Sequence, residues 1–552
     1  MHKRVKNKIN RNGRKVLLVS ILCLFGFCLA AQSQANKNRS KQKNTSKVYL
    51  LHSNLLKKSK NLPDVQVLVG DVVFRHDSVY MYCDSAYFYE KKNMLEAFSE
   101  VRMEQGDTLS LYGDYMSYDG NTQIAQVRKN VRMENRNTVL LTDSLNYDRL
   151  TELGYYFNGG KLMDDENVLT SDWGEYSPAT KESVFNYDVK LENPQFTLTS
   201  DTLRYNTATK IANIVGPSNI KSDKNHIYSE MGFYDTQSGQ AELLQRSVLT
   251  NEGKRLVGDS LFYDRNLGIG KAYYNVIMTD TINKSKVTGN YCLYNEKTGY
   301  AFATDKALAV DYSQGDSLFL HADTLQMYTY HINTDSMYRE MRAYHKVRIF
   351  RTDVQGVCDS LVFSAKDTCL TMFLDPVLWN NQQQLLGEKI MIYMNDSTLK
   401  SVHVANQALS VEKLDSVNFN QVSGKDMKAF FKNGEMERVN VTGSVRLVYF
   451  PMEQDSTFIG MNVSETSQLD IYLQNRKMKK MVMSPKAKGT LYPMNQLPVD
   501  QQKLENFVWL DNVRPKNRED VFNWRGKKAG QGLKKSNRNT APLPNRKLFN
   551  KK

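Results

Sequence analysis

The stretch from residue 259 to residue 278 reads Asp259-Ser-Leu-Phe-Tyr-Asp264, then Arg-Asn-Leu-Gly-Ile, then Gly270-Lys-Ala-Tyr-Tyr-Asn-Val-Ile-Met278. In the first run Leu261 and Tyr263 share one face of an extended chain, and Phe262 points to the other face. The Asp-Arg-Asn-Leu-Gly segment is typical of a turn. The second run has the aromatic and β-branched content of a strand. The stretch therefore predicts two antiparallel strands joined by a short turn.

The first of these strands recurs along the chain at a fixed distance. Its tyrosine returns every 29 residues and finally after 31, at Tyr118, Tyr147, Tyr176, Tyr205, Tyr234, Tyr263 and Tyr294. An acidic or amide residue stands four positions before each tyrosine, at Asp114, Asp143, Asp172, Asp201, Glu230, Asp259 and Asn290. The position after each tyrosine holds Asp119, Asp148, Ser177, Asn206, Asp235, Asp264 or Asn295. A period of this length indicates one supersecondary unit used many times, with each unit packed on the next.

The second strand is repeated as well, because Val-x-Met or Val-x-Ile closes it in several units, as in Val276-Ile-Met278 and Val347-Arg-Ile349. The repeats predict an all-β fold of stacked antiparallel strands, regular over residues 48–300 and degenerate, with longer loops, over 301–485. No window of comparable length has the 3.6-residue periodicity of a helix. About twelve units, each advancing roughly 10 Å, would make a rod on the order of 100 Å long.

The two ends of the chain differ from this body. Residues 2–15 carry seven Lys/Arg and precede an apolar run, Val16–Ala30, so residues 1–31 are expected to be a cleaved signal peptide. The alternative is an uncleaved anchor, although the run is short for a membrane span. We expect residues 32–47 to be a basic linker. Residues 486–552 are Pro-, Asn- and Lys-rich and are expected to be a largely disordered basic tail.

The charge and the motifs exclude several functions. The net charge of +15 comes from the two ends, and the body is acidic. That distribution does not suit a nucleic-acid-binding groove. The sequence has no catalytic, nucleotide-binding or zinc motif, so we expect no enzyme, cofactor or metal site. Cys358 and Cys369 could pair across a hairpin or could be small apolar core residues.

The repeated acids could hold calcium, but the nonapeptide calcium pattern is absent. An Asp before Ser-Leu is expected instead to accept backbone N–H bonds at a turn.

The inward face offers the candidate binding residues. Leucines two residues before the tyrosine or apolar column would stack into an apolar stripe beside the tyrosine stripe. The candidates that line this surface are Tyr118, Leu145, Tyr147, Tyr176, Leu203, Tyr205, Tyr234, Leu261, Tyr263 and Tyr294. The stripe is either a closed core or an open groove suited to acyl chains. Gly174 and Gly232 replace the leucine in two units, and Ala86 replaces it in the first. Such gaps favour the groove, because a packed core tolerates them poorly.

Four runs carry a family resemblance. Gly70-Asp-Val-Val-Phe-Arg-His76 and Met81-Tyr-Cys-Asp-Ser-Ala-Tyr-Phe-Tyr89 resemble the OstA-like proteins of Bacteroidota. So do Gln105-Gly-Asp-Thr-Leu-Ser-Leu-Tyr-Gly-Asp114 and Val127-Arg-Lys-Asn-Val-Arg-Met133. Those proteins belong to the LptA/OstA superfamily of periplasmic lipopolysaccharide-transport proteins. The resemblance is closest over residues 48–300 and fades by residue 450.

The resemblance implies an elongated, open β-jellyroll of V-shaped strands that holds the acyl chains of lipid A. It further implies a non-enzymatic periplasmic bridge that contributes to outer-membrane assembly. Its expected partners are lipopolysaccharide, other lipopolysaccharide-transport proteins paired through edge strands, and further copies of the chain joined head to tail. Association with the outer membrane is a further expectation.

Two other functions stay open. One is a non-catalytic envelope scaffold, a closed β-solenoid that binds protein partners. The other is a carbohydrate-active β-helix, which would need a carboxylate pair that the sequence does not display.

Overall fold

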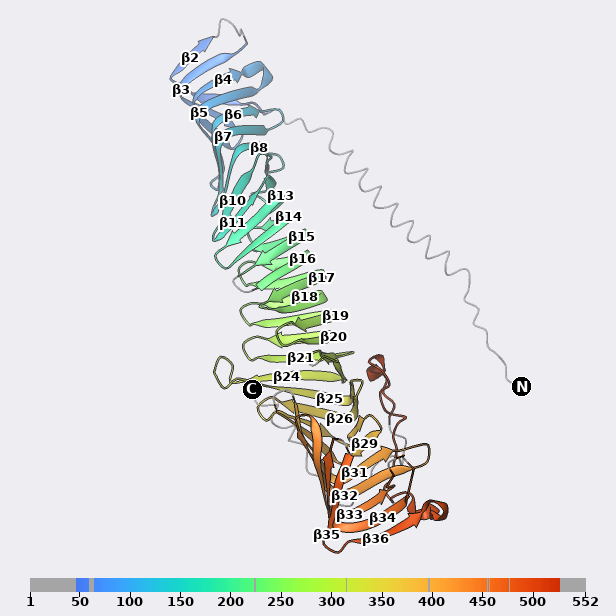
Figure 1. The fold of residues 1–552 in the computed structure, drawn as a ribbon. Coiled ribbons are helices and arrows are strands. Elements are labelled where there is room, and N and C mark those ends of the chain that lie inside the picture. The colour runs from blue at the N-terminus through green and yellow to red at the C-terminus, as the bar shows by residue number, and fades with distance from the viewer. Residues whose placement is uncertain are drawn as a thin grey trace, which may run out of the picture. The chain divides into compact units, whose positions relative to one another are not determined.

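The fold consists of antiparallel strands stacked one on the next (Figure 1). The computed structural model describes residues 46–58, 64–222, 225–313, 315–395, 398–453, 455, 457–475 and 477–526. The predicted signal peptide, nearly all of the linker and the last part of the tail lie outside these residues. Among the described residues, 3-10 turns are the only helices, and none is long and apolar enough to cross a bilayer. The all-β prediction is confirmed.

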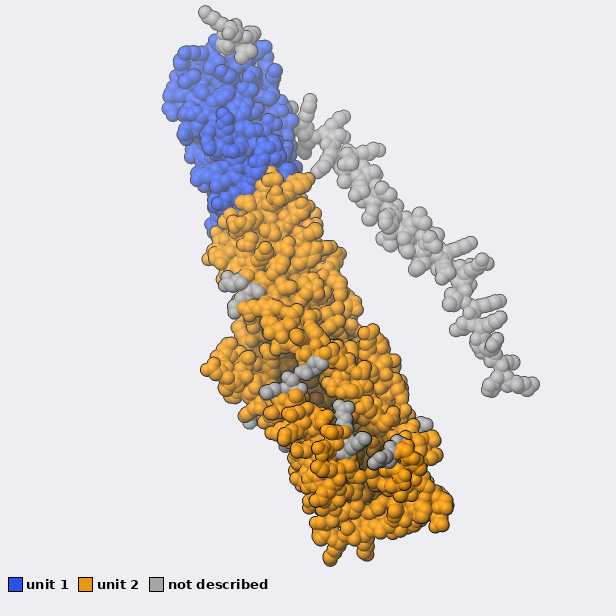
Figure 2. Space-filling model, viewed as in Figure 1, with its two compact units in different colours: residues 1–163, 173–180 blue, residues 164–172, 181–552 orange. Residues whose placement is uncertain are grey.

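The chain divides into two compact units, which Figure 2 colours separately. Unit 1 comprises Met1–Met163 and Trp173–Thr180, and unit 2 comprises Asp164–Asp172 and Lys181–Lys552.

In unit 1, β3 to β8 pair in chain order, β1 and β2 both pair with β3, and β9 pairs with β8 and β12. The strands are β1 (Tyr49–His52), β2 (Leu55–Lys58), β3 (Gln66–His76), β4 (Val79–Tyr89), β5 (Met94–Gln105), β6 (Leu109–Asp119), β7 (Ile124–Asn135), β8 (Thr138–Asp148), β9 (Leu153–Tyr156), β12 (Trp173–Tyr176) and β10 (Gly160–Asp164), whose last residue belongs to unit 2. A 3-10 turn, η1 (Glu90–Lys92), joins β4 to β5.

Unit 2 begins with strands that pair in chain order, and all of them except the first are long: β11 (Asn167–Ser171), β13 (Glu182–Asn193), β14 (Phe196–Asn206), β15 (Ile211–Lys221), β16 (Asn225–Asp235), β17 (Gln240–Asn251), β18 (Lys254–Asp264), β19 (Ile269–Asp280) and β20 (Ser285–Asn295).

Further along unit 2, some strands are long and others are broken into two shorter pieces. The pieces and their long neighbours are β21 (Tyr300–Thr304), β22 (Leu308–Asp311), β23 (Leu318–His321), β24 (Thr324–Tyr330), β25 (Tyr338–Phe350), β26 (Val354–Ser364), β27 (Cys369–Phe373), β28 (Val377–Asn380), β29 (Gln383–Leu386), β30 (Lys389–Asn395), β31 (Thr398–Lys413), β32 (Phe419–Lys432), β33 (Glu435–Tyr449), β34 (Gly460–Gln474), β35 (Lys477–Ser484) and β36 (Lys488–Pro493). For example, β21 and β22 both pair with β20. The 3-10 turns η2 (Met494–Gln496), η3 (Val499–Gln501) and η4 (Glu519–Phe522) follow.

Most long strands bend in the middle. In β17, Gln245 and Arg246 both have positive φ, and the register to β18 shifts beside them. Such a bulge kinks a strand. We call the half-strands that carry Leu198, Leu256 and their cross-strand partners wall A. The half-strands that carry Tyr205, Tyr263 and their partners form wall B. The bent strands give the V shape that the resemblance implies.

The position of the acids is partly as predicted. Asp235 and the residues equivalent to it, one position after each tyrosine, cap turns: Asp235 Oδ1 accepts from the backbone N–H of Gln237 at 2.9 Å. The acids four positions before each tyrosine were expected at turns too, and that prediction is wrong. Asp259 lies inside β18 at the bend, where its carboxylate accepts from Asn275 Nδ2 at 2.6 Å. Asp114 accepts from Asn130 Nδ2 at 2.8 Å in the same way, so at these two bends the acid binds an amide in the bulge of the neighbouring strand.

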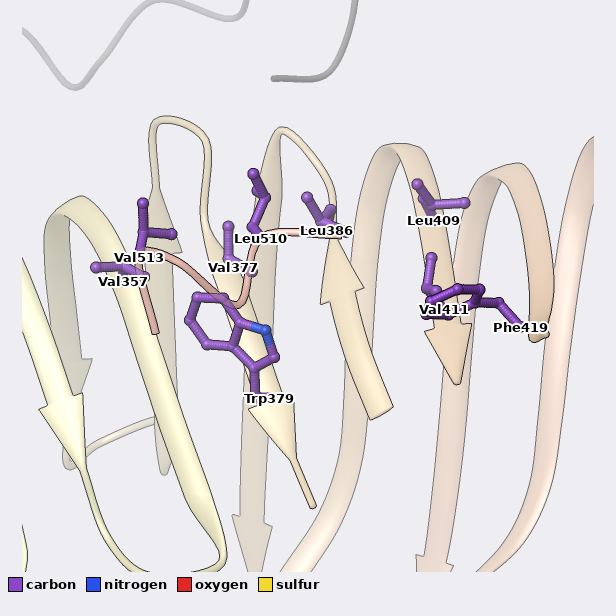
Figure 3. Packing of buried hydrophobic residues seen from close by; sticks show 9 residues of the cluster. All are labelled: Val357, Val377, Trp379, Leu386, Leu409, Val411, Phe419, Leu510 and Val513. Carbon is purple, nitrogen blue, oxygen red and sulfur yellow. The ribbon is translucent and has the colours of Figure 1, made fainter. Parts of the chain in front are cut away.

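The tail prediction is wrong for residues 486–526. This segment forms β36 and then a strap, residues 497–526, that packs on the sheet. Gln384 in β29 donates to Val508 O and accepts from Leu510 N, both at 2.8 Å. Leu510 and Trp379 are fully buried, and Figure 3 shows them beside each other.

Gln421 in β32 holds the strap in the same way, through Gln502 O and Leu504 N, each at 2.8 Å. The composition concealed this packing because only a few apolar residues anchor the strap, and buried glutamine side chains satisfy its backbone.

Both cysteines discussed above are buried, Cys358 in β26 and Cys369 in β27.

Candidate functional site

The tyrosines of wall B form one row on the inner face. In unit 2, Tyr205 lies opposite Ala212, Ala212 opposite Tyr234, Tyr234 opposite Ala241 and Ala241 opposite Tyr263. Directly opposed residues of an antiparallel pair share a face. A small residue on every second strand gives each tyrosine ring the room to lie over its neighbour.

The mouth of the V is its open side, where the ends of wall A and wall B face each other. In unit 1 the tyrosines of wall B reach across this mouth and bind residues of wall A. Tyr118 lies 2.6 Å from His76 Nδ1, and Tyr147 donates to Gln105 Oε1 at 3.3 Å. Asn135 Nδ2 donates to the hydroxyl of Tyr176 at 3.1 Å. We call each such contact a tyrosine clasp. The clasps close the mouth, and the tyrosines behind them are at most 2% exposed.

The first clasps of unit 2 are of the same kind. Tyr205 donates to Asp164 Oδ2 at 2.8 Å and accepts from Asn167 Nδ2 at 3.0 Å. Burial, and then the bond to Asp164, raise the pKa of Tyr205, so its hydroxyl keeps its proton. The next tyrosine, Tyr234, meets the ring of Phe196 instead, with 4.6 Å between the ring centroids.

The clasps then end. Tyr263 is half-buried and Tyr294 is 41% exposed, whereas Tyr234 is 5% exposed. Asn225, at the position of Phe196 one repeat later, accepts from Asn251 Nδ2 at 2.6 Å. Among the described residues, no contact between the two walls therefore closes the mouth of the V at Tyr263 and Tyr294.

The facing row on wall A opens over the same strands. In unit 2 the row begins with buried members that are at most 5% exposed: Leu169, Leu191, Leu198, Ile220 and Ile227. Its next five members are half-buried: Leu249, Leu256, Met278, Val287 and Ala309. The row is buried again at Leu320 and Ile349.

We call these five residues, together with Tyr263 and Tyr294 opposite them, the open trough. Wall B stays half-buried further on, at Met327 and Met341 of β24 and β25, and Figure 2 shows the surface of unit 2 hollowed near that level.

The ten candidate residues thus fall into two groups. Eight are closed off, with exposures of 5% or less: Tyr118, Leu145, Tyr147, Tyr176, Leu203, Tyr205, Tyr234 and Leu261. The other two, Tyr263 and Tyr294, belong to the open trough. The structure brings all ten to the inner face of the bent strands, as the alternation of side chains requires.

The glycine gaps do not make a groove. A Cβ on Gly174 would come within 2.4 Å of the hydroxyl of Tyr156, whose ring fills that space. A Cβ on Gly232 would meet the carbonyl oxygen of Glu242 at 2.3 Å. Ala86 is 1% exposed. The gaps are occupied by neighbouring atoms, so the inference from them was wrong.

The wall A residues of the trough were missed as site residues. A signal for them was present, because the last residue of the Val-x-Met pattern lies in this row: Met103 and Met133 in unit 1, and Met278 in unit 2. The pattern fixes the face of these residues. It carries no information on whether the mouth above them is closed.

The trough is apolar in its chemistry. Its wall A members are aliphatic or thioether side chains, and polar groups lie at its mouth, as in sites for amphiphiles. Among the described residues, no cluster of three or more His, Cys, Asp and Glu side chains could hold a metal ion.

Comparison with known proteins agrees with the resemblance seen in the sequence. The family model described as OstA-like protein matches residues 45–201 and 195–259. The comparison with curated proteins found no match. Among solved structures, a similar chain is LptH, described as the LptA homologous periplasmic component of the conserved lipopolysaccharide transport device from Pseudomonas aeruginosa. It is 18% identical, covers 20% of this chain and 87% of its own, and has a TM-score of 0.19.

Proposed function

Because residues 45–259 form an OstA-like region, we propose that this protein is a periplasmic carrier of lipopolysaccharide. It holds acyl chains in the open trough and passes them towards the outer membrane. Export by a cleaved signal peptide in residues 1–31 belongs to the same proposal.

The proposal rests on one observation. Five consecutive residues of the wall A row are half-buried and no longer buried, although all five are apolar. Ile227 is 5% exposed, and its cross-strand partner Leu249 is half-buried. A gap in packing at random positions would not follow one row on one face.

The trough has the dimensions of an acyl chain. Its five wall A residues lie on five adjacent strands, so the row is roughly 19 Å long at a spacing of about 4.8 Å per strand. Half of a bilayer's hydrocarbon core, which one acyl chain spans, is about 15 Å. Burial of each CH₂ group contributes about 0.8 kcal/mol, so one chain can be held without any enclosed pocket.

The clasped strands favour a second role within the same molecule. In each unit taken by itself, the clasped strands have a filled inner face, as in the scaffold alternative. We propose that these strands are a stiff support that binds protein partners through their edge, and that cargo is held only where the clasps are missing.

The charges of the edge strands indicate which protein partner is favoured. The outer strands of unit 1 carry Lys57 and Lys58, and those of unit 2 carry Lys479, Lys480 and Lys488. Head-to-tail pairing of two copies would bring these basic edges together, and like charges opposite each other destabilise a strand pair. We therefore propose another lipopolysaccharide-transport protein, with a less basic edge, as the favoured partner over a second copy.

The test is photo-crosslinking in cells at three positions of the full chain. Met278 faces the trough, its neighbour Thr279 faces outwards with similar burial, and Leu198 belongs to the same row under the clasps. A photoreactive residue at 278 is expected to capture lipopolysaccharide, whereas 279 and 198 are not. Equal capture at 278 and 279, or none at 278, would rule the proposal out.

A further inference from the structure

The strap is held on the sheet in two different ways along its length. Its first part is held by uncharged groups, namely apolar contacts and the side chains of Gln421 and Gln384. An amide side chain neither gains nor loses a proton in the physiological range, so the docking of this part does not depend on pH. The last part, which includes η4 (Glu519–Phe522), lies on ionisable side chains instead.

Two buried ionisable residues, His321 of β23 and Arg348 of β25, lie under this last part. They are directly opposite each other in the sheet, next to Leu320 and Ile349 of the inner row, so they face the outer side of wall A. The ring of Phe522 lies against His321, with 4.8 Å between the ring centroids. The end of the strap therefore covers both groups.

Arg348 anchors the end of the strap. Its Nε donates to the carbonyl oxygen of Val521, and its guanidinium carbon lies 5.4 Å from the centroid of the Trp524 ring. Its Nη1 is buried without a hydrogen-bond partner among the described residues. Burial lowers the pKa of Arg348 to about 10, so the residue is still a cation at neutral pH. A second positive charge placed beside it under the strap is unfavourable.

His321 is the group that can bring such a charge. Its Nδ1 donates to the carbonyl oxygen of Ala307 at 2.7 Å. Burial, and then the charge of Arg348, lower the pKa of His321 below its usual value of 6.5. The docked strap therefore favours the neutral imidazole.

The carboxylates near these two residues already have other partners. Asp323 accepts from Lys346 Nζ at 3.0 Å. Asp520 is bound within the strap itself, by the guanidinium of Arg525 and by the backbone N–H of Lys516. Neither carboxylate is bonded to His321, so a proton on the imidazole gains no ion pair in the docked arrangement.

We propose that residues 519–525 form an acid-released latch, which detaches from wall A when His321 is protonated. Detachment lets water reach both cations, while the part of the strap held by Gln384 and Gln421 stays docked. The docked state binds the proton less readily than the released state. Docking of the latch is therefore complete above pH 6.5 and is lost as the pH falls towards the docked pKa of His321.

The position of the latch connects it with the open trough. Leu320 and Ile349, on the inner side of the same strand pair, are where the wall A row becomes buried again. The latch thus covers the back of the strands at which the open trough ends. The inference does not depend on what the trough holds.

The test is hydrogen–deuterium exchange of the full chain, measured by mass spectrometry and corrected for the pH dependence of intrinsic exchange. Between about pH 7.5 and about pH 5, the protection of residues 519–525 is expected to fall about tenfold, because the proton is taken up mainly by the released state. Residues 502–510, in the part held by the glutamines, are expected to keep their protection over the same range.

Two variants remove the titrating group. H321Q keeps a hydrogen-bonding side chain, and H321F keeps a ring against Phe522. In both variants the protection of residues 519–525 is expected to be the same at the two pH values. The control variant H345Q removes an exposed histidine of β25 and is expected to behave as the wild type does.

Three outcomes would contradict the latch. The wild type could keep its protection at the lower pH, or both His321 variants could still lose theirs. Residues 502–510 and 519–525 could also lose protection together, in which case acid acts on unit 2 as a whole. The carrier function is unaffected by any of these results, because no acyl chain takes part in the measurement.

Discussion

Tyr205 and Tyr263 occupy the same position in the repeat, 58 residues apart, but they differ in burial and in contacts. Tyr205 is 1% exposed and is held by Asp164 and Asn167 of the opposite wall. Tyr263 is half-buried, and Asn225, which stands at the partner position on the other wall, bonds with Asn251 instead. The tyrosine is constant, so the partner on the other wall decides whether the V is closed. A closed core and an open trough can therefore be built from one repeat.

The largest expected effect separates the two regions by their packing. Y147A removes a fully buried ring and should lower the local free energy of opening by about 3–5 kcal/mol. Y294A removes a ring that is 41% exposed and should change it by less than about 1 kcal/mol. Hydrogen–deuterium exchange of the strands around each residue measures both values. Similar losses at the two sites would show that the trough is as tightly packed as the clasped core.

The hydroxyl alone should have a smaller effect of the same kind. Y205F leaves Asp164 and Asn167 without one buried hydrogen bond each, which should cost about 1–3 kcal/mol. Y263F at the unclasped position should stay within about 0.5 kcal/mol of the wild type. Thermal unfolding followed by circular dichroism is the measurement. A comparable fall in Tm for both variants would remove the distinction between clasped and unclasped tyrosines.

The clasp at His76 should make unit 1 sensitive to acid. Burial, and then the charge of Arg149, lower the pKa of His76 below its usual value of 6.5. The folded state binds the extra proton less readily than the unfolded state, so this contribution to stability is complete above pH 6.5 and is lost as the pH falls towards the folded pKa. The Tm of the wild type should decline over that window, and H76Q should decline less steeply. Parallel curves for the two proteins would exclude His76 as the source.

The smallest change in stability is expected from building a clasp. N225F places a ring where Phe196 has one in the clasped repeat, opposite Tyr263. It should change the free energy of unfolding by no more than about 1 kcal/mol, because both positions are at the rim. It should nevertheless weaken dodecyl maltoside binding several-fold by covering the trough. If N225F binds dodecyl maltoside as the wild type does, the ligand does not enter through the mouth above Tyr263.

Several features of the fold followed directly from the amino acids. The 29-residue tyrosine period predicted the stack, and the alternation around Leu261 and Tyr263 predicted the inner face correctly. The Val-x-Met pattern marked the row that contains Met278. These features are local, since strand alternation and turn chemistry act over a few residues.

The packing around the glycines and of the tail could not be predicted from local sequence patterns. Gly174 looked like a hole, but the ring that fills it belongs to Tyr156 on the paired strand. Residues 497–526 looked too polar to pack, but Gln384 and Gln421 come from strands about 80 to 130 residues earlier and satisfy their backbone. Both outcomes depend on residues that are distant in the sequence.

The sequence by itself determined that this protein is a stack of bent strands with tyrosines and leucines on the inside, because a short repeat imposes the same alternation in every unit. Only the tertiary structure decided which tyrosines are closed. Each clasp joins residues 38 to 42 positions apart on opposite walls, such as His76 with Tyr118 and Phe196 with Tyr234. That distance exceeds one repeat, so the partner becomes visible only when the strands are stacked.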